Sequence, residues 1–250
     1  MRLRRLILLF WVLITVPGYA LNRQEADVVF EQANTAYREA DYQQAAKYYE
    51  QILDGGWESG ALFYNLGSSY FREGDLGKTI LNYERARRLI PRDQELTANY
   101  RYACSLRKPG ADDRLQTWIS HFLRISSDLL SMHDMIWFLF LILILLGCGH
   151  GLYLFGFLSR KFFRGFFVGL SVIWGILLFS LIGNMIHNNQ RAVILTESQA
   201  RFEPRPEATA HFDVVPGQTV KITGQEAQWV KIKRVDGKRG WVPKDALEKI

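Results

Sequence analysis

The chain has 250 residues, of which 48% are hydrophobic and 22% are charged, and its formal net charge is +6. Residues 2–5 and residues 160–164 each contribute three cations, whereas residues 21–110 carry 12 basic and 13 acidic side chains and residues 192–250 carry 10 and 8. Neither long polar segment has the strongly basic surface that phosphate recognition requires, which excludes nucleic acid as a partner.

Residues 1–20 have the layout of a secretory signal peptide. A basic start precedes an apolar stretch at residues 6–16, and then Pro17 and Gly18 break the helix before the small residue Ala20. This order predicts export of the segment that follows. An uncleaved anchor of the same orientation is the alternative, and it would leave the topology of the rest unchanged.

A repeat occupies residues 26–106. Shifting the sequence by 34 residues aligns YREADYQQAAKYYEQI with FREGDLGKTILNYERA. With helical periodicity, this period predicts an all-α solenoid of helix pairs. Gly67 is expected where two paired helices meet, because a larger side chain would force them apart. Residues 94–106 are expected to form a capping helix for this short array.

The second unit of the repeat resembles the tetratricopeptide repeat (TPR) family. The shared positions are Leu66, Gly67, Tyr70, Gly74, Asp75, Tyr83, Ala86 and Pro91. The first unit has Ala36 where the family usually has tyrosine, but it keeps Ala33, Asp41, Tyr42, Ala45 and Tyr49. Arrays of this family bind extended peptides or partner helices in a groove lined by the first helix of each pair. The resemblance therefore implies a partner-binding groove lined by Asn34, Tyr37, Arg38, Tyr64, Asn65, Ser68, Phe71 and Arg72.

Two of these groove residues raise a narrower possibility. Asn34 and Asn65 resemble two members of the clamp with which some TPR proteins hold a C-terminal carboxylate. The basic members of that clamp are missing, because Phe30 and Glu95 stand where lysines would be. The alternative is that the polar side chains simply solvate an exposed face.

Residues 112–134 place apolar side chains at helical spacing, with charged residues between them. This amphipathic pattern predicts a helix that lies in the membrane interface. Packing against the repeat array is the alternative.

Two apolar runs follow, residues 135–158 and residues 166–187, and a helix of either length can cross the roughly 30 Å hydrocarbon layer. Few residues separate the runs, so we expect an antiparallel transmembrane hairpin. Its connecting loop, residues 159–165, reads SRKFFRG. Because basic residues in short loops stay in the cytoplasm, both soluble domains are expected on the periplasmic side of a bacterial inner membrane.

Small residues recur four apart in the two runs, at Gly147 and Gly151 and again at Gly165 and Gly169. Such spacing lets helix backbones approach closely, either within the hairpin or against another subunit. His150 is a titratable group inside the first run, and such groups usually mark a functional or partner-facing site. These five residues are therefore candidates for membrane assembly.

From residue 196 the pattern changes to short alternating runs broken by glycine, which predicts a small all-β barrel over residues 196–250. The segment resembles the bacterial SH3-like family, with its W-x-K-[IV] strand and G-W-V ending. Members of that family often bind cell-wall peptides or other proteins. Trp229 and Trp241 are interpreted as core residues in preference to ligand platforms. The candidates for an exposed groove are Phe202, Arg205 and Phe212.

The order of these parts resembles the E-type proteins of the Bat aerotolerance operon (BatE-type proteins). The resemblance implies a scaffold subunit in an inner-membrane complex that serves oxygen or envelope stress tolerance. It further implies partners among the Bat proteins with von Willebrand A-type domains, together with a MoxR-type ATPase encoded nearby. The expected class is a multidomain membrane protein with a TPR solenoid, a two-helix hairpin and an SH3-like barrel.

No nucleophile–base pair, CxxC or HExxH motif stands out in the sequence, so we expect no enzymatic activity, no cofactor and no metal. The main alternative to a scaffold is a cell-wall sensor whose SH3-like domain binds peptidoglycan. A transporter that uses His150 would need more than two spans.

Overall fold

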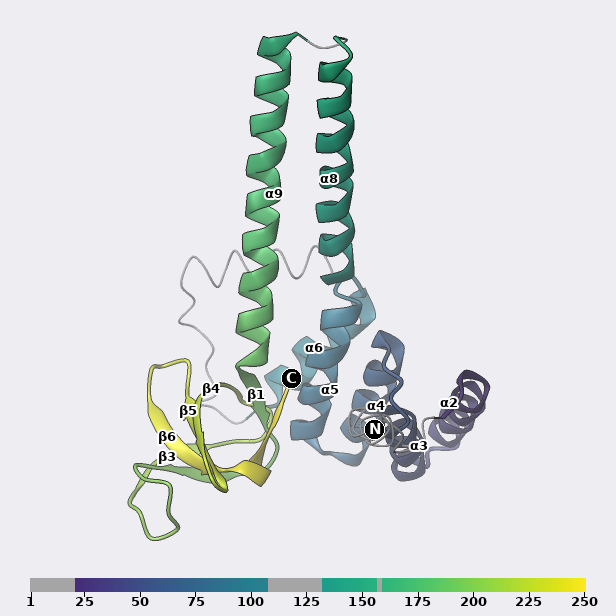
Figure 1. The fold of residues 1–250 in the computed structure, drawn as a ribbon. Coiled ribbons are helices and arrows are strands. Elements are labelled where there is room, and N and C mark those ends of the chain that lie inside the picture. Colours follow the sequence, from purple (N-terminus) through teal and green to yellow (C-terminus); the bar gives the residue numbers. More distant parts are fainter. Residues whose placement is uncertain (1–20, 108–131, 157–158) are drawn as a thin grey trace, which may run out of the picture.

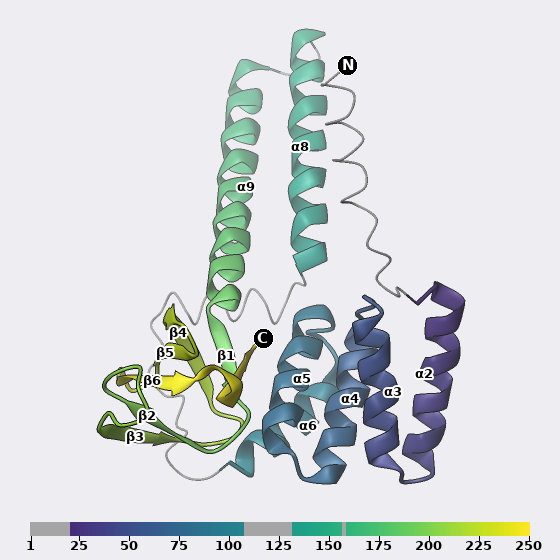
Figure 2. The same ribbon diagram turned by 60° about the horizontal axis from the view of Figure 1, so that its bottom comes forward.

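The computed structural model describes residues 21–107, 132–156 and 159–250. It contains a helical array, a hairpin of two long helices and a C-terminal antiparallel sheet (Figure 1). The array and the sheet lie side by side at one end of the hairpin, as Figures 1 and 2 both show. The predicted signal peptide, and all but the last three residues of the predicted interfacial helix at 112–134, lie outside the described residues.

The array consists of α2 (Arg23–Arg38), α3 (Tyr42–Asp54), α4 (Gly60–Glu73), α5 (Leu76–Leu89) and α6 (Gln94–Ser105). Each helix packs against the next one along the chain. A polar side chain accepts a backbone N–H at the start of every helix, which satisfies one of the donors that a helix leaves unpaired there. These capping residues are Asn22, Asp41, Ser59, Asp75 and Asp93.

The helices repeat with the 34-residue period of the sequence. Helices α3 and α5 begin 34 residues apart, and an aspartate caps the start of each. The close helix contact expected at Gly67 is confirmed, because a Cβ placed there would lie 2.7 Å from the Tyr83 ring. Tyr83 is 2% exposed and lies in the core that α4, α5 and α6 share. The capping helix predicted at 94–106 corresponds to α6.

The hairpin consists of α8 (Met132–Leu154) and α9 (Arg160–Asn189). Its segments Asp134–Leu154 and Phe163–Gly183 are each 21 residues long with a mean hydropathy of 2.3, so both helices fit a membrane protein. The predicted loop at 159–165 is shorter than expected, because α9 already includes Arg160, Lys161 and Arg164. The first hydrogen bond of α9 runs from the Phe163 N–H to the Ser159 carbonyl at 2.9 Å.

The sheet has seven strands in the order β3-β2-β6-β5-β4-β1-β7, and all neighbours are antiparallel. The strands are β1 (Arg191–Ile194), β2 (Ser198–Arg201), β3 (Ala210–Val214), β4 (Thr219–Glu226), β5 (Trp229–Lys233), β6 (Arg239–Pro243) and β7 (Leu247–Lys249), with a 3-10 turn η1 (Lys244–Ala246) before β7. Strand β1 begins before the predicted boundary at residue 196. Only Gln190 separates it from α9.

The core of the sheet corrects two expectations about its aromatic residues. Val230 and Ile232 of β5 point into the core. Because successive side chains of a strand alternate, Trp229, the first residue of β5, points outward. Trp229 and Trp241 are half-buried and lie outside the core cluster. Phe212, expected in an exposed groove, is instead a core residue that is only 9% exposed.

Candidate functional site

The predicted groove residues lie on one face of the array, which is built by α2, α4 and α6. We call it the A face. At its centre, the Asn34 side-chain oxygen accepts hydrogen bonds from the Tyr49 hydroxyl at 2.7 Å and from the Asn65 amide at 3.3 Å. Burial raises the pKa of Tyr49 to about 12, so this hydroxyl remains a donor at neutral pH. These bonds tie α2 to α4.

The same bonds argue against the carboxylate clamp. In a clamp, the two asparagine side chains would have to turn towards a ligand, but here they bond to each other and to Tyr49. Phe30, at one of the positions where a clamp has lysine, packs edge-on against Tyr49 with 5.7 Å between ring centres. The asparagines therefore hold the A face together.

A second network joins α4 to α6. The Tyr64 hydroxyl donates to the Glu95 carboxylate at 2.7 Å and accepts from the Asn99 amide at 2.6 Å. Burial and the Glu95 hydrogen bond both raise the pKa of Tyr64, so its proton stays in place. The Tyr64 ring stacks on Tyr83 at 5.7 Å, and the Ser68 hydroxyl lies 3.1 Å from the Tyr83 hydroxyl. These hydrogen bonds and ring contacts therefore hold the interior of the A face in one geometry.

Asn99 was missed as a site residue, although it follows Asn65 by one 34-residue period. That spacing could have identified it. The remaining predicted residues lie towards the C-terminal ends of the helices. Phe71 packs edge-on against Tyr102 at 5.8 Å, and the rings of Tyr37 and Tyr42 meet at 5.2 Å. Arg38 and Arg72 are exposed there.

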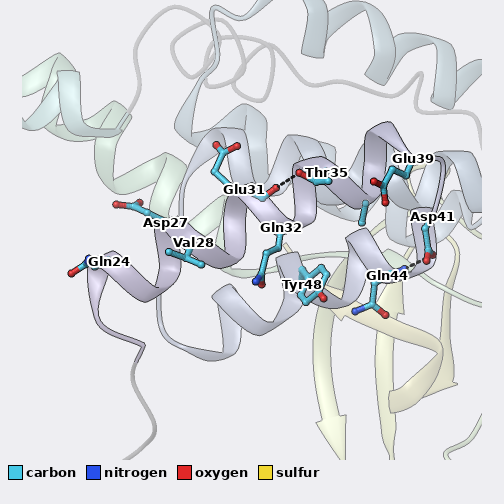
Figure 3. A pocket seen from close by; sticks show the side chains of 11 residues that line it. Gln24, Asp27, Val28, Glu31, Gln32, Thr35, Glu39, Asp41, Gln44 and Tyr48 are labelled. Carbon is cyan, nitrogen blue, oxygen red and sulfur yellow. Dashed lines mark hydrogen bonds between the residues drawn. The ribbon is translucent and has the colours of Figure 1, made fainter.

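A groove of about 730 Å³ lies elsewhere on the array, along the outer side of α2 and α3 (Figure 3). Its carboxylates are Asp27, Glu31, Glu39 and Asp41. The Asp41 carboxylate accepts the Gln44 N–H at 3.0 Å, and the Thr35 hydroxyl donates to the Glu31 carbonyl at 2.9 Å. Both hydrogen bonds are local to their helices, since the first caps the start of α3 and the second lies within α2. None of the eight predicted groove residues lines this outer groove.

The glycines expected to bring α8 and α9 together do not do so. A Cβ at Gly147, Gly151, Gly165 or Gly169 would meet nothing within 4 Å. The close approach occurs instead at a different glycine, Gly149, where a Cβ would lie 3.0 Å from the Phe166 ring. Assembly of the four outward glycines with another subunit stays a prediction.

His150 lies one helical turn before the end of α8, close to the hairpin tip and not near the middle of the span. It is exposed, and its ring centre is 5.9 Å from that of Phe163. Tyr153 stacks on the same Phe163 ring at 4.3 Å. The apolar run at 135–158 extends past the end of α8 at Leu154, so His150 lies nearer to the end of the helix than the run implied.

The sheet carries a groove of its own, about 340 Å³ in volume. Its lining residues are Ser198, Gln199, Arg201, Pro206, Trp229 and Pro243. Phe202 and Arg205, which the sequence suggested for such a groove, are exposed in the loop after β2 and do not line it. The exposed edge of Trp229 makes this a surface on which an apolar or planar group could pack.

Residues 200–248 match the family of bacterial SH3 domains. The match runs from β2 to β7 and leaves out β1, although β1 pairs with both β4 and β7. No curated protein matches the chain. The SH3 domain therefore takes an additional strand that comes directly from α9.

The SH3 domain is fixed to the array by an ion pair that sequence patterns did not reveal, in which Glu84 is buried and the Arg191 side chain is 24% exposed. Arg191 of β1 donates to the Glu84 carboxylate of α5 at 2.9 Å, and the Tyr100 hydroxyl of α6 donates to the same carboxylate at 2.6 Å. Glu84 is 4% exposed. Burial by itself would raise the pKa of Glu84, but the charges of Arg191 and Arg87 outweigh it and hold the pKa below its usual value.

Further contacts surround this ion pair. Val193 of β1 is fully buried in the array core, and a Cβ at Gly77 of α5 would lie 2.6 Å from the Leu195 carbonyl oxygen. Arg85 bonds to the Glu248 carboxylate at 2.7 Å, and Arg88 bonds to the Ile250 carbonyl at 2.8 Å. We call this set of contacts the array–SH3 joint.

Proposed function

We propose that the protein is a non-catalytic scaffold subunit of a bacterial inner-membrane complex, which binds other membrane proteins along the A face. The observation that carries the proposal is the convergence of side chains from α2, α4 and α6 on one face, where hydrogen bonds fix them in advance. Fixed side chains lower the entropy cost of binding an extended partner. In this proposal α2 to α6 form two TPR repeats and a capping helix, for which the 34-residue recurrence of the helices is the support.

The proposal places the array and the SH3 domain in the periplasm, downstream of a signal peptide at residues 1–20. Arg160, Lys161 and Arg164 lie at the end of the hairpin far from both, and cations beside a short loop stay in the cytoplasm (Figure 1). The array–SH3 joint requires the two parts to share one side of the membrane.

The order of the parts supports a role like that of BatE-type proteins. On that proposal the partners are Bat proteins with von Willebrand A-type domains, and the complex contributes to tolerance of oxygen or envelope stress. The match of residues 200–248 to bacterial SH3 domains agrees with protein or cell-wall binding and does not distinguish between them.

The proposed orientation predicts a labelling pattern. In a Cys104→Ser, Cys148→Ser background, Thr209→Cys on the SH3 domain should react with a membrane-impermeant maleimide in intact spheroplasts. Ser159→Cys, which keeps all three tip cations, should react only after lysis. The opposite pattern, or equal labelling of both positions before lysis, would refute the orientation.

The scaffold role predicts that Tyr64→Ala reduces co-purification of membrane partners with the full-length protein by about tenfold, since a central aromatic residue commonly dominates an interface. Lys47→Ala, an exposed change on α3, is the control and should leave recovery unchanged. Tyr64→Phe keeps the ring and tests whether the loss comes from misfolding. Full recovery with a folded Tyr64→Ala protein would exclude the A face as the binding surface.

A cell-wall sensor is the second candidate, and the exposed edge of Trp229 in the SH3 groove favours it. The test uses the full-length protein in detergent micelles, because residues 196–250 alone would lack β1. Purified peptidoglycan should retain the wild-type protein and should not retain the Trp229→Ala variant. If the wall material fails to retain the wild type, this candidate is eliminated.

A further inference from the structure

Two arginines lie at equivalent positions of the A face, one repeat apart. Arg38 is in the last turn of α2 and donates to the Thr35 hydroxyl at 3.0 Å, and Arg72 is in the last turn of α4. Within the described residues, neither guanidinium has a carboxylate within ion-pair distance, whereas Arg85 and Arg191 each have one. The A face therefore presents two arginines whose guanidinium groups have no ion-pair partner in the described part of the chain.

Arg72 is also held in position. It donates to the Tyr42 hydroxyl at 2.7 Å, and its guanidinium lies 5.0 Å from the centre of that ring. The negative end of the helix dipole accounts for a cation in the last turn of α4, but it does not account for this reach across to α3. The contact with Tyr42 fixes the guanidinium and leaves it exposed.

The third helix of the A face ends differently. One period after Arg72 stands Leu106, which is 50% exposed, and nearby Tyr102 is 58% exposed while its ring meets Phe71. These residues form an apolar end of the face beside its two cations. The carboxylate of Glu95 lies in the first turn of α6, at the opposite end of the helices, where it is bonded to Tyr64.

We propose that the A face binds an extended partner segment that is acidic at one end and apolar at the other. Its carboxylates pair with Arg72 and Arg38, and its large apolar side chain packs on Phe71, Tyr102 and Leu106. This inference rests on the proposed function of the A face as a protein-binding surface and specifies the partner's chemistry.

The test measures binding of fluorescent eight-residue peptides to the full-length protein in micelles. One peptide has two glutamates near one end and leucine and phenylalanine near the other. A second replaces the glutamates with lysines, and a third replaces the apolar pair with serines. The first should bind at least fivefold more tightly than either of the others, and added salt should weaken its binding.

Variants of Arg72 then test whether this arginine pairs with the glutamates of the peptide. Arg72→Ala should weaken binding of the acidic peptide about fivefold, and Arg72→Lys should restore part of the lost affinity. Arg72→Glu should reverse the preference in favour of the lysine peptide, which a purely structural role of Arg72 would not produce. Arg101→Ala, another exposed arginine of the array, is the matched control and should change nothing.

Equal binding of the acidic and basic peptides to the wild type would overturn the inference, as would unchanged binding by Arg72→Ala. If the peptides fail while Tyr64→Ala still loses its membrane partners, the scaffold stands and this partner chemistry is wrong. If both experiments fail, the proposed function fails as well.

Discussion

Replacing Glu84 with alanine is expected to lower the free energy of unfolding by about 3–5 kcal/mol. The change leaves Arg191 without its carboxylate inside the array–SH3 joint and removes the acceptor of the Tyr100 hydroxyl. Arg191, which is largely shielded from water, then keeps most of its desolvation cost and forfeits the attraction. Urea unfolding of the full-length protein in micelles, followed by tryptophan fluorescence, measures the change.

Glu58→Ala is the matched control for this variant, because Glu58 is exposed in the connection between α3 and α4. Its effect should stay within about 0.5 kcal/mol. Glu84→Gln keeps an oxygen that can accept from Tyr100, so it should cost less than the alanine change. An alanine variant as stable as the control would mean that the ion pair contributes nothing to the joint.

The same residue predicts how stability depends on pH. The pKa of Glu84 is lower in the folded protein than in the unfolded chain, where it is about 4.3. Its contribution is therefore fully present above the unfolded pKa and is lost as the pH falls through the lower folded pKa. The stability gap between the wild type and Glu84→Gln should be constant near neutral pH and shrink in acid below pH 4.3. A gap that does not change across this acid range would contradict the assignment.

Gly77→Val is expected to lower the free energy of unfolding by about 3 kcal/mol. A Cβ at this position would lie 2.6 Å from the Leu195 carbonyl oxygen and 2.8 Å from its Cα. Both are backbone atoms, so no side chain can rotate away and α5 must move apart from the end of β1. The measurement is urea unfolding, combined with cross-linking of Arg85→Cys to Glu248→Cys by a short bis-maleimide in a background without native cysteines.

The cross-link should form in the parent protein, where these two side chains meet at 2.7 Å, and should be lost in Gly77→Val. Gly165→Val is the control, because a Cβ there would meet nothing within 4 Å. Retention of the cross-link at wild-type yield would show that the joint tolerates the added side chain.

The sequence predicted the parts of the fold that local patterns determine. The 34-residue period with helical spacing predicted the helix pairs, and the apolar runs of α8 and α9 follow from composition alone. Strand β1 was missed because its buried residues, Ala192 to Ile194, form a continuous apolar run with no alternation. The alternation of β5 was visible, but whether Trp229 or Val230 faces inward depends on the rest of the sheet.

The candidate site divides in the same way. The positions of Asn34, Tyr64 and Arg72 on one face follow from the 34-residue period and the helical spacing together. Tyr64 and Arg72 are equivalent to residues 30 and 38, which stand four before and four after Asn34 on the same side of a helix. The hydrogen bonds that occupy Asn34 and Tyr64 could not be read from that period. The array–SH3 joint could not be predicted from the sequence, because Glu84 and Arg191 are 107 positions apart and no motif links them.

The short passage from α9 to β1 determines how high the soluble parts stand above the lipid. With Phe163–Gly183 in the hydrocarbon, six further residues of α9 remain, and they rise by about 9 Å, only slightly more than the roughly 5–7.5 Å depth of the lipid headgroups. The connection from α9 to β1 is Gln190 alone, so it adds little further distance between the helix and the SH3 domain. With the hairpin in a membrane, the SH3 domain and the array fixed to it would therefore rest against the membrane surface. If the A face binds a partner as proposed, that partner has to present its segment close to the bilayer, as a stretch of chain next to a transmembrane helix does.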